Sequence, residues 1–226
     1  MKLFANACTA FLVACLGLGD GIGFAYAANE PLLLAVKVVR AGDVELHYVE
    51  RGNGVPVIFV HGSLDDYRTF EPQLEPLSHR YRVISYSRRY NFPNAPRIPS
   101  GSHSALVEAA DLASLLQALG AYPAHVVGHS YGAYTALILA MKHPELVRSL
   151  VLAEPPLLRW LPGLPDGQRR YTDFMNNMWE PTGREFRQGN SEQAMRMTID
   201  WFGKNGYLIE GKPARFDALP TERCDT

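Results

Sequence analysis

The chain has 226 residues, of which 47% are hydrophobic and 20% are charged, and its formal net charge at pH 7 is −1. This composition is that of a single globular domain with enough apolar side chains to form a core. The near-zero net charge gives no electrostatic basis for binding nucleic acid or an anionic membrane surface, so we expect neither as a partner.

The first 27 residues have the layout of a secretory signal peptide. Lys2 gives a positive start, Ala10–Gly19 is almost wholly apolar, and Ala25-Tyr26-Ala27 matches the A-x-A cleavage pattern. The segment is too short and too rich in glycine to span a bilayer, so no transmembrane span is expected. We expect an exported protein, periplasmic or secreted, whose mature chain begins at Ala28.

An alternative leader is visible in the same stretch. Leu12-Val13-Ala14-Cys15 resembles a bacterial lipobox, in which Cys15 would be acylated and would anchor the protein. Against it, the residues after Cys15 stay mostly apolar as far as Ala28, where a lipoprotein normally continues into a polar tether. If the leader is removed, Cys224 is the one cysteine left, so the mature chain forms no intramolecular disulfide.

Strand and helix patterns alternate from position 36 onward. Apolar and β-branched runs predict strands, and helical spacing of leucines and alanines predicts helices. The strands are predicted at 36–40, 44–49, 56–60, 81–86, 124–127 and 147–153, and the helices at 69–77, 105–119 and 133–143. An antiparallel hairpin followed by this alternation is typical of an α/β fold with a mostly parallel sheet and right-handed crossovers.

The character of the sequence changes after position 156. Residues 157–206 are rich in Met, Trp, Tyr and Arg and contain no strand-like run. Asn190 with Gln193 resembles a helix N-cap, and an apolar stripe follows at helical spacing. We therefore divide the mature chain into a core, 28–156, and a helical cap with a tail, 157–226. The cap would offer an apolar surface to a substrate, or its side chains would serve only to pack it onto the core.

A complete G-x-S-x-G motif lies between a predicted strand and a predicted helix. It reads Gly128-His129-Ser130-Tyr131-Gly132. A sharp strand-to-helix turn needs small residues two positions either side of the serine, and the two glycines supply them. The turn would lift the Ser130 hydroxyl clear of the sheet, next to a helix N-terminus with free backbone N–H groups.

These residues carry a resemblance to a known family. His61-Gly62-Ser63 after the first long strand, the G-x-S-x-G motif, and His143-Pro144-Glu145 before the strand at 147–153 resemble the α/β-hydrolase fold, in particular its bacterial esterase- and haloperoxidase-like members. The resemblance covers about residues 36–153 and, by its helices, extends to Leu219.

The resemblance implies a mechanism. Ser130 would be the nucleophile of a serine hydrolase and form an acyl-enzyme, and the backbone N–H groups of Ser63 and Tyr131 would form the oxyanion hole. A serine at 130, where some relatives carry aspartate, disfavours epoxide-hydrolase and dehalogenase chemistry. It favours acyl transfer from an apolar small-molecule substrate such as a carboxylic ester, thioester, lactone or amide, with no cofactor and no metal.

The acid and the base are harder to place. Members of the family carry them after the serine, in the order acid, then histidine. Glu154, at the end of the strand 147–153, is the candidate acid, although a solvated carboxylate is an equal alternative. His143, the one histidine after Ser130, lies at the far end of the same helix and cannot reach it. His129 and His61 flank the motif, but we do not expect either to be the base.

The tail suggests a reason for the absent histidine. Two further strand–helix units would need roughly 60 more residues, whereas the chain ends in the polar segment 221–226. We therefore expect a C-terminally truncated family member whose last strands are missing and whose activity is impaired. The alternative is a protein of another class, a non-catalytic pseudo-hydrolase or a small-molecule-binding fragment.

Overall fold

The computed structural model describes residues 34–94 and 103–204. The predicted leader, 1–27, and the tail from 205 onward lie outside the described residues, so export and truncation stay predictions. Internal contacts divide the chain into two units, with the boundary between Leu158 and Arg159. Each unit is described by itself below.

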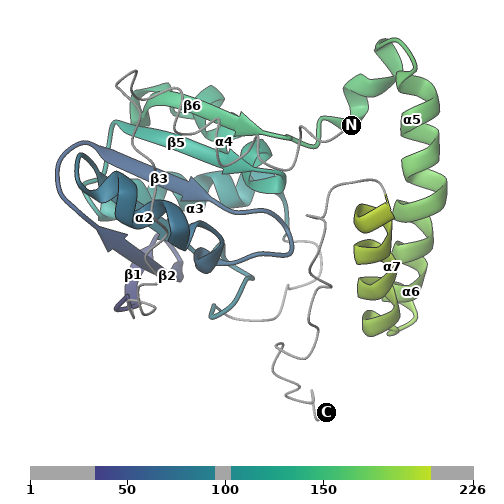
Figure 1. Cartoon of the computed structure of the whole chain (residues 1–226), viewed down its shortest axis with the longest axis horizontal. Helices are drawn as coiled ribbons and strands as arrows, with labels where there is room; N and C mark the ends of the chain where they lie inside the picture. Colours follow the sequence, from purple (N-terminus) through teal and green to yellow (C-terminus); the bar gives the residue numbers. More distant parts are fainter. Residues whose placement is uncertain (1–33, 95–102, 205–226) are drawn as a thin grey trace, which may run out of the picture. The chain divides into compact units, whose positions relative to one another are not determined.

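The first unit is built on a six-stranded sheet with the order β1-β2-β4-β3-β5-β6 (Figure 1). β1 pairs with β2 and β2 with β4 in antiparallel fashion, whereas β4, β3, β5 and β6 run parallel. This is the predicted α/β sheet with an antiparallel start. The strands are β1 (Lys37–Ala41), β2 (Val44–Arg51), β3 (Pro56–Val60), β4 (Arg82–Tyr86), β5 (Ala124–His129) and β6 (Val147–Ala153).

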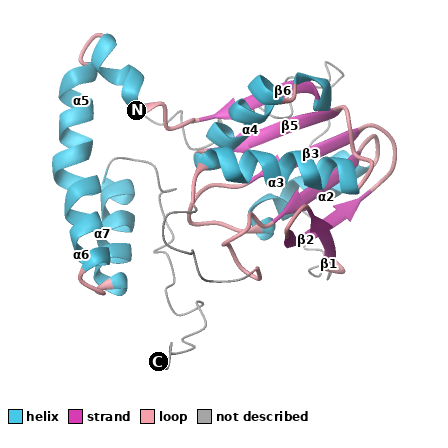
Figure 2. Cartoon of the chain, turned by 180° about the vertical axis from the view of Figure 1, so that it is seen from behind, coloured by secondary structure: helices cyan, strands magenta, loops and turns pink. Residues whose placement is uncertain are grey.

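Helices cover both faces of this sheet. Helix α2 (Glu71–Ser78) lies on one face, and α3 (Ala105–Ala118) and α4 (Tyr131–Lys142) lie on the other (Figures 1 and 2). Because β3 is covered on both sides, its central residues Val57, Ile58 and Phe59 are at most 6% exposed. The continuous apolar run at 56–60 is the pattern expected of such a strand.

The junction of β5 and α4 is tighter than the sequence alone indicated. β5 continues to His129 and α4 begins at Tyr131, two residues before the predicted helix start, so one residue, Ser130, makes the whole turn. The chain can turn this sharply because Gly128 and Gly132 lack side chains. A Cβ at Gly128 would lie 2.6 Å from Ala133 Cα, and one at Gly132 would lie 2.1 Å from the Val60 carbonyl oxygen.

The second unit is helical, as its composition predicted. It contains α5 (Gly167–Phe174), a five-residue π-helical segment (Met175–Trp179), α6 (Glu180–Arg187) and α7 (Ser191–Lys204). Asn190 stands at the predicted N-cap position, since its carbonyl accepts the Ala194 N–H at 3.0 Å, but its side-chain amide donates to Glu185 at 2.9 Å. Phe174 packs against Trp179 and Trp201, with ring centroids 6.2 and 6.4 Å away. The placement of this unit over the sheet stays a prediction.

Candidate functional site

Ser130 occupies a backbone conformation that side-chain-bearing residues rarely adopt. Its φ is 52° and its ψ is −122°, and its N–H donates to the Ala153 carbonyl at 2.8 Å. Such conformations are disfavoured for residues with a Cβ and persist where the surrounding structure enforces them, commonly at functional sites. Here β5, α4 and the end of β6 together hold Ser130 at the carboxyl end of the parallel strands.

Two backbone N–H groups lie beside Ser130. Tyr131 is the first residue of α4, so its N–H has no acceptor within the helix. Ser63 lies in the turn after β3, and a Cβ built on the preceding Gly62 would be 3.3 Å from Ser130 Cβ. Among the described residues, neither N–H donates a hydrogen bond. The two donors that the sequence singled out are thus brought close to the serine with their bonding capacity unused.

His61 is a buried part of the turn that carries Ser63. Its Nε2 accepts the Arg88 N–H at 3.0 Å, so Nδ1 carries the proton and donates to the Gly62 carbonyl at 2.8 Å. Burial, reinforced by the positive charge of Arg88, lowers the pKa of His61 to about 3. The ring is therefore neutral and structural, in agreement with the expectation that it is not the base.

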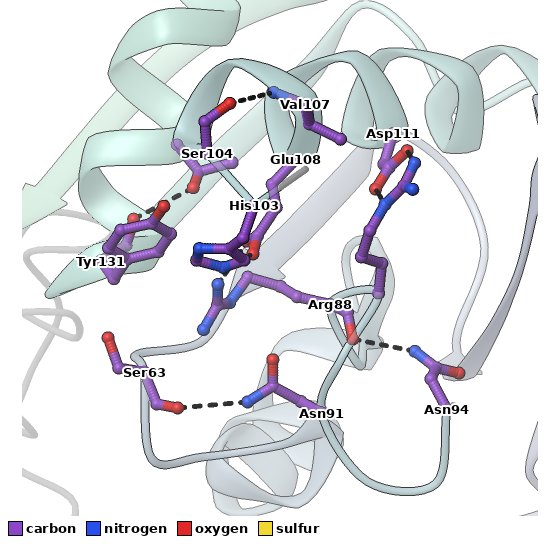
Figure 3. Close-up of polar contacts among 12 residues, drawn as sticks. Ser63, Arg88, Asn91, Asn94, His103, Ser104, Val107, Glu108, Asp111 and Tyr131 are labelled. Atoms are coloured by element: carbon purple, nitrogen blue, oxygen red, sulfur yellow. Dashed lines mark hydrogen bonds and ion pairs between the residues drawn. The ribbon is translucent and has the colours of Figure 1, made fainter. Parts of the chain in front are cut away.

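A network of polar and aromatic side chains lies beside the turn that carries Ser63 (Figure 3). The Arg88 guanidinium is 3% exposed and forms an ion pair with the equally buried Glu108 of α3. The second oxygen of Glu108 lies 2.9 Å from His103 Nε2, and the His103 ring stacks on Tyr131. Burial and the nearby Glu108 charge raise the pKa of the Tyr131 phenol to about 12, so Tyr131 stays protonated.

The two adjacent arginines after β4 both pair with carboxylates of α3, Arg88 with Glu108 and Arg89 with Asp111. The Arg88 side chain is buried. A signal was available in the sequence, since Glu108 lies on the helix face that also carries the buried Ala105 and Leu112.

Glu154, the candidate acid, follows β6 directly. Its backbone is close to Ser130, because Ala153, the preceding residue, accepts the Ser130 N–H. Its φ is 53° and it is exposed, and its carboxylate makes no hydrogen bond or ion pair with another described residue. The structure thus places Glu154 at the edge of the site without a partner.

All seven histidines of the chain lie within the described residues, and none of them is hydrogen-bonded to the Ser130 hydroxyl. His143, at the far end of α4, lies 3.3 Å from Glu145. His129 is the nearest in sequence, but its Nδ1 is directed toward Asp65, 3.9 Å away. The remaining five contact Asn94, Gly62, Glu75, Glu108 and Ser149.

Within the described ranges, no group of three or more His, Cys, Asp or Glu side chains is arranged to hold a metal ion. In the same part of the chain, none of the helices combines the length and the apolar character needed to cross a bilayer.

A sequence profile of the α/β hydrolase fold matches residues 55–221, which is well over half of the chain. The chain belongs to the α/β hydrolase family. The match begins at β3 and includes both the turn at Ser63 and the Ser130 motif, the features on which the resemblance was based.

Curated relatives match the core over part of its length. A putative carbamate hydrolase, RutD, of Azorhizobium caulinodans is 35% identical over 113 residues, which are 50% of this chain and 42% of the relative. The 2-(acetamidomethylene)succinate hydrolase of Mesorhizobium japonicum is 34% identical over 113 residues, 50% of this chain and 40% of that protein. The chain thus matches about two fifths of the length of these relatives.

Solved structures support the fold. A mutant epoxide hydrolase from Bacillus megaterium superposes with a TM-score of 0.60 over 76% of this chain and 62% of its own, at 22% identity. A mutant epoxide hydrolase from Vigna radiata gives a TM-score of 0.57 over 65% of this chain and 46% of its own, at 24% identity. At this level of identity, the likeness concerns the fold alone.

Proposed function

We propose that this α/β hydrolase uses Ser130 as a nucleophile on the carbonyl carbon of a carboxylic ester or related acyl substrate. The observation that carries the proposal is the conformation of Ser130 between β5 and α4, with two unbonded N–H groups beside it. Such donors stabilise the negative oxygen that develops when a hydroxyl adds to a carbonyl, and each contributes about 10²–10³ in rate.

The reaction has two steps. The Ser130 oxygen forms a bond to the carbonyl carbon, the leaving group departs with a proton, and water then releases the acid from the acyl-enzyme. One relative is named as a putative carbamate hydrolase and another as a 2-(acetamidomethylene)succinate hydrolase, and both kinds of compound contain an acyl group bonded to nitrogen. Their names support an acyl substrate and extend the candidates from esters to amides and carbamates.

The 226-residue chain is expected to be a weak catalyst, because none of its histidines is hydrogen-bonded to Ser130. Without a general base the hydroxyl is a poor nucleophile. In serine proteases that lose the catalytic triad, a residual acceleration of about 10³–10⁴ over water remains from binding and the oxyanion hole. We assign a residual acceleration of the same kind to this chain. Glu154 would be the acid that orients a histidine, if one is supplied by another polypeptide segment.

Chemical rescue tests the proposal. Hydrolysis of p-nitrophenyl acetate is measured for the chain and for Ser130→Ala, each with and without imidazole, and the Ser130→Ala rate is subtracted as background. We expect slow Ser130-dependent turnover that imidazole increases severalfold, since it supplies the absent base. Equal rates for both proteins at every imidazole concentration would contradict the proposal and favour a non-catalytic binding protein. Fast turnover without imidazole would show that a base is already present.

A further inference from the structure

We propose that Arg88, assisted by Asn91, is a positioning residue that holds the Ser63 N–H in the direction needed to bind a negative oxygen formed at Ser130. The inference rests on the proposed function, because it assigns a purpose to the turn beside the nucleophile. It extends the candidate site by two residues, Arg88 and Asn91, which follow β4 in the chain and are not part of the G-x-S-x-G motif.

The first contact is between Arg88 and the peptide group that contains the Ser63 N–H. Arg88 Nη2 donates to the Gly62 carbonyl at 2.9 Å, and His61 Nδ1 donates to the same oxygen at 2.8 Å. In a planar trans peptide, the carbonyl oxygen and the following N–H point in opposite directions. Two donors that fix the Gly62 oxygen therefore also fix the direction of the Ser63 N–H.

The second contact secures the next peptide group of the turn. Asn91 Nδ2 donates to the Ser63 carbonyl at 3.2 Å and to the Asp65 carbonyl at 2.9 Å (Figure 3). Ser63 itself is exposed, so packing contributes little to its orientation. Side-chain donors from the segment after β4 thus hold the peptide groups on both sides of Ser63.

Arg88 also contacts the residue that carries the second donor. Its guanidinium carbon lies 5.0 Å from the centroid of the Tyr131 ring, while its Nη1 is paired with Glu108. Figure 3 shows the Arg88 side chain between Tyr131 and the turn that bears Ser63. One side chain therefore contacts the turn that carries one proposed oxyanion donor, the ring of the residue that carries the other, and Glu108 of α3.

The Arg88–Glu108 pair carries no net charge, so its influence on an oxyanion comes mainly from geometry. Misplacing a catalytic group by about 1 Å can cost about 10²-fold in rate. Removing both partners with uncharged side chains of similar size avoids leaving a single buried charge, which is the costly outcome. The double variant Arg88→Met/Glu108→Gln is therefore the principal test.

A matched control lies one residue further along the chain. Arg89 forms an ion pair with Asp111 of the same helix, with Nε 2.6 Å from Oδ2, and makes no hydrogen bond to residues 61–65. The double variant Arg89→Met/Asp111→Asn removes an ion pair between the same two segments, together with the contact of Arg89 with the exposed Asp43. It controls for the loss of an ion pair to α3 without removing a hydrogen bond to the turn.

The experiment measures binding of phenylboronic acid to the 226-residue chain. The Ser130 oxygen forms a bond to boron, its proton passes to solvent, and one boron-bound oxygen takes the place of the oxyanion. We expect Arg88→Met/Glu108→Gln to weaken binding at least about tenfold and Asn91→Ala about threefold. Arg89→Met/Asp111→Asn should change it less than twofold. In the imidazole-rescued assay, the first two variants should lower kcat and leave KM unchanged.

The outcomes separate the inference from the proposed function. If the unmodified chain and Ser130→Ala bind phenylboronic acid equally, the proposed nucleophile is wrong. If binding depends on Ser130 but Arg88→Met/Glu108→Gln and its control behave alike, the positioning role is overturned. Should the Arg88 double variant fail to fold, Asn91→Ala decides, because Asn91 is only partly buried; unchanged binding by that variant would then overturn the inference.

Discussion

The two sides of Ser130 differ in how firmly they are built. On the side of β3 and β4, the turn at 61–65 receives side-chain hydrogen bonds from His61, Arg88 and Asn91. On the side of β6, a single backbone hydrogen bond joins Ser130 to Ala153, and Glu154 is exposed without a described partner. The site therefore has an organised half that would bind an anion and an open half where protons would be transferred.

This difference follows from what each half must do. Donors to an oxyanion work only if they are fixed before charge develops, so they need rigid support from neighbouring groups. A general base must reach the hydroxyl through a hydrogen bond, and none of the seven histidines of this chain does so. The comparison is testable. Substitutions in the organised half, around the turn at 61–65, should change stability or turnover strongly, and substitutions in the open half, at Glu154, should change them little.

The largest effect is expected where α4 approaches β3. In Gly132→Ala, the new methyl group would lie 2.1 Å from the Val60 oxygen and 2.4 Å from the His61 oxygen, both of them backbone atoms. We expect the free energy of unfolding, measured by urea denaturation, to fall by about 3 kcal/mol. Gly163→Ala is the control, because no atom lies within 4 Å of its Cβ position. Equal stability of the two variants would contradict the close approach.

The second prediction concerns the pH dependence of stability. The folded state keeps His61 neutral to a pKa of about 3, whereas the unfolded ring protonates near its ordinary value of 6.5. The contribution of the neutral His61 ring to the free energy of unfolding is therefore complete above pH 6.5 and is lost as the pH falls toward 3. Between pH 6.5 and pH 4.5 the loss is about 2 kcal/mol. Urea denaturation should show this slope reduced in His61→Asn and retained in His79→Asn, whose side chain is exposed. A slope that survives in His61→Asn would refute the assignment.

The third prediction separates backbone strain from chemistry at Ser130. Alanine at this position keeps a Cβ and therefore the unfavourable φ of 52°, while glycine relieves it. We expect Ser130→Gly to be more stable than Ser130→Ala by about 1 kcal/mol, with both variants inactive. Thermal or urea unfolding of the pair measures the difference directly. A glycine variant less stable than the alanine variant would mean that the turn is unstrained.

The smallest effect is expected in the open half. Glu154→Gln should change the free energy of unfolding by less than about 0.5 kcal/mol, because an exposed side chain without a partner contributes little. Imidazole-rescued turnover should change less than twofold, since free imidazole is not held by this carboxylate. A tenfold loss would show that Glu154 already acts on the base in this chain, and the open half would have to be redefined.

The sequence was sufficient for the sheet and for the position of Ser130, and the reason is local. The run at 56–60 is wholly apolar and the run at 147–153 is apolar except for Arg148 and Ser149, and they match the observed bounds of β3 and β6. Parallel strands in such sheets carry mainly apolar side chains. The glycines at 128 and 132 indicated the tight turn because only small residues fit there. These features depend on near neighbours in the chain.

The partners of the turn could not be predicted in the same way. Arg88 and Glu108 are 20 residues apart, and Asn91 contacts carbonyl groups 26 and 28 residues before it. A pattern of charges cannot say which arginine meets which carboxylate, because that depends on how α3 packs on the sheet. Only the tertiary structure distinguishes the arginine that supports the site from the one that does not.

The adjacent arginines have a consequence for how this protein can vary. Arg88 and Arg89 point to different surroundings, one toward the turn at Gly62 and the other toward Asp111 and the exposed Asp43. Mutations that share no contacts generally have additive effects. Position 89 can therefore change together with Asp111 without removing a hydrogen bond to the turn at Gly62, while its neighbour at 88 can change only together with Glu108.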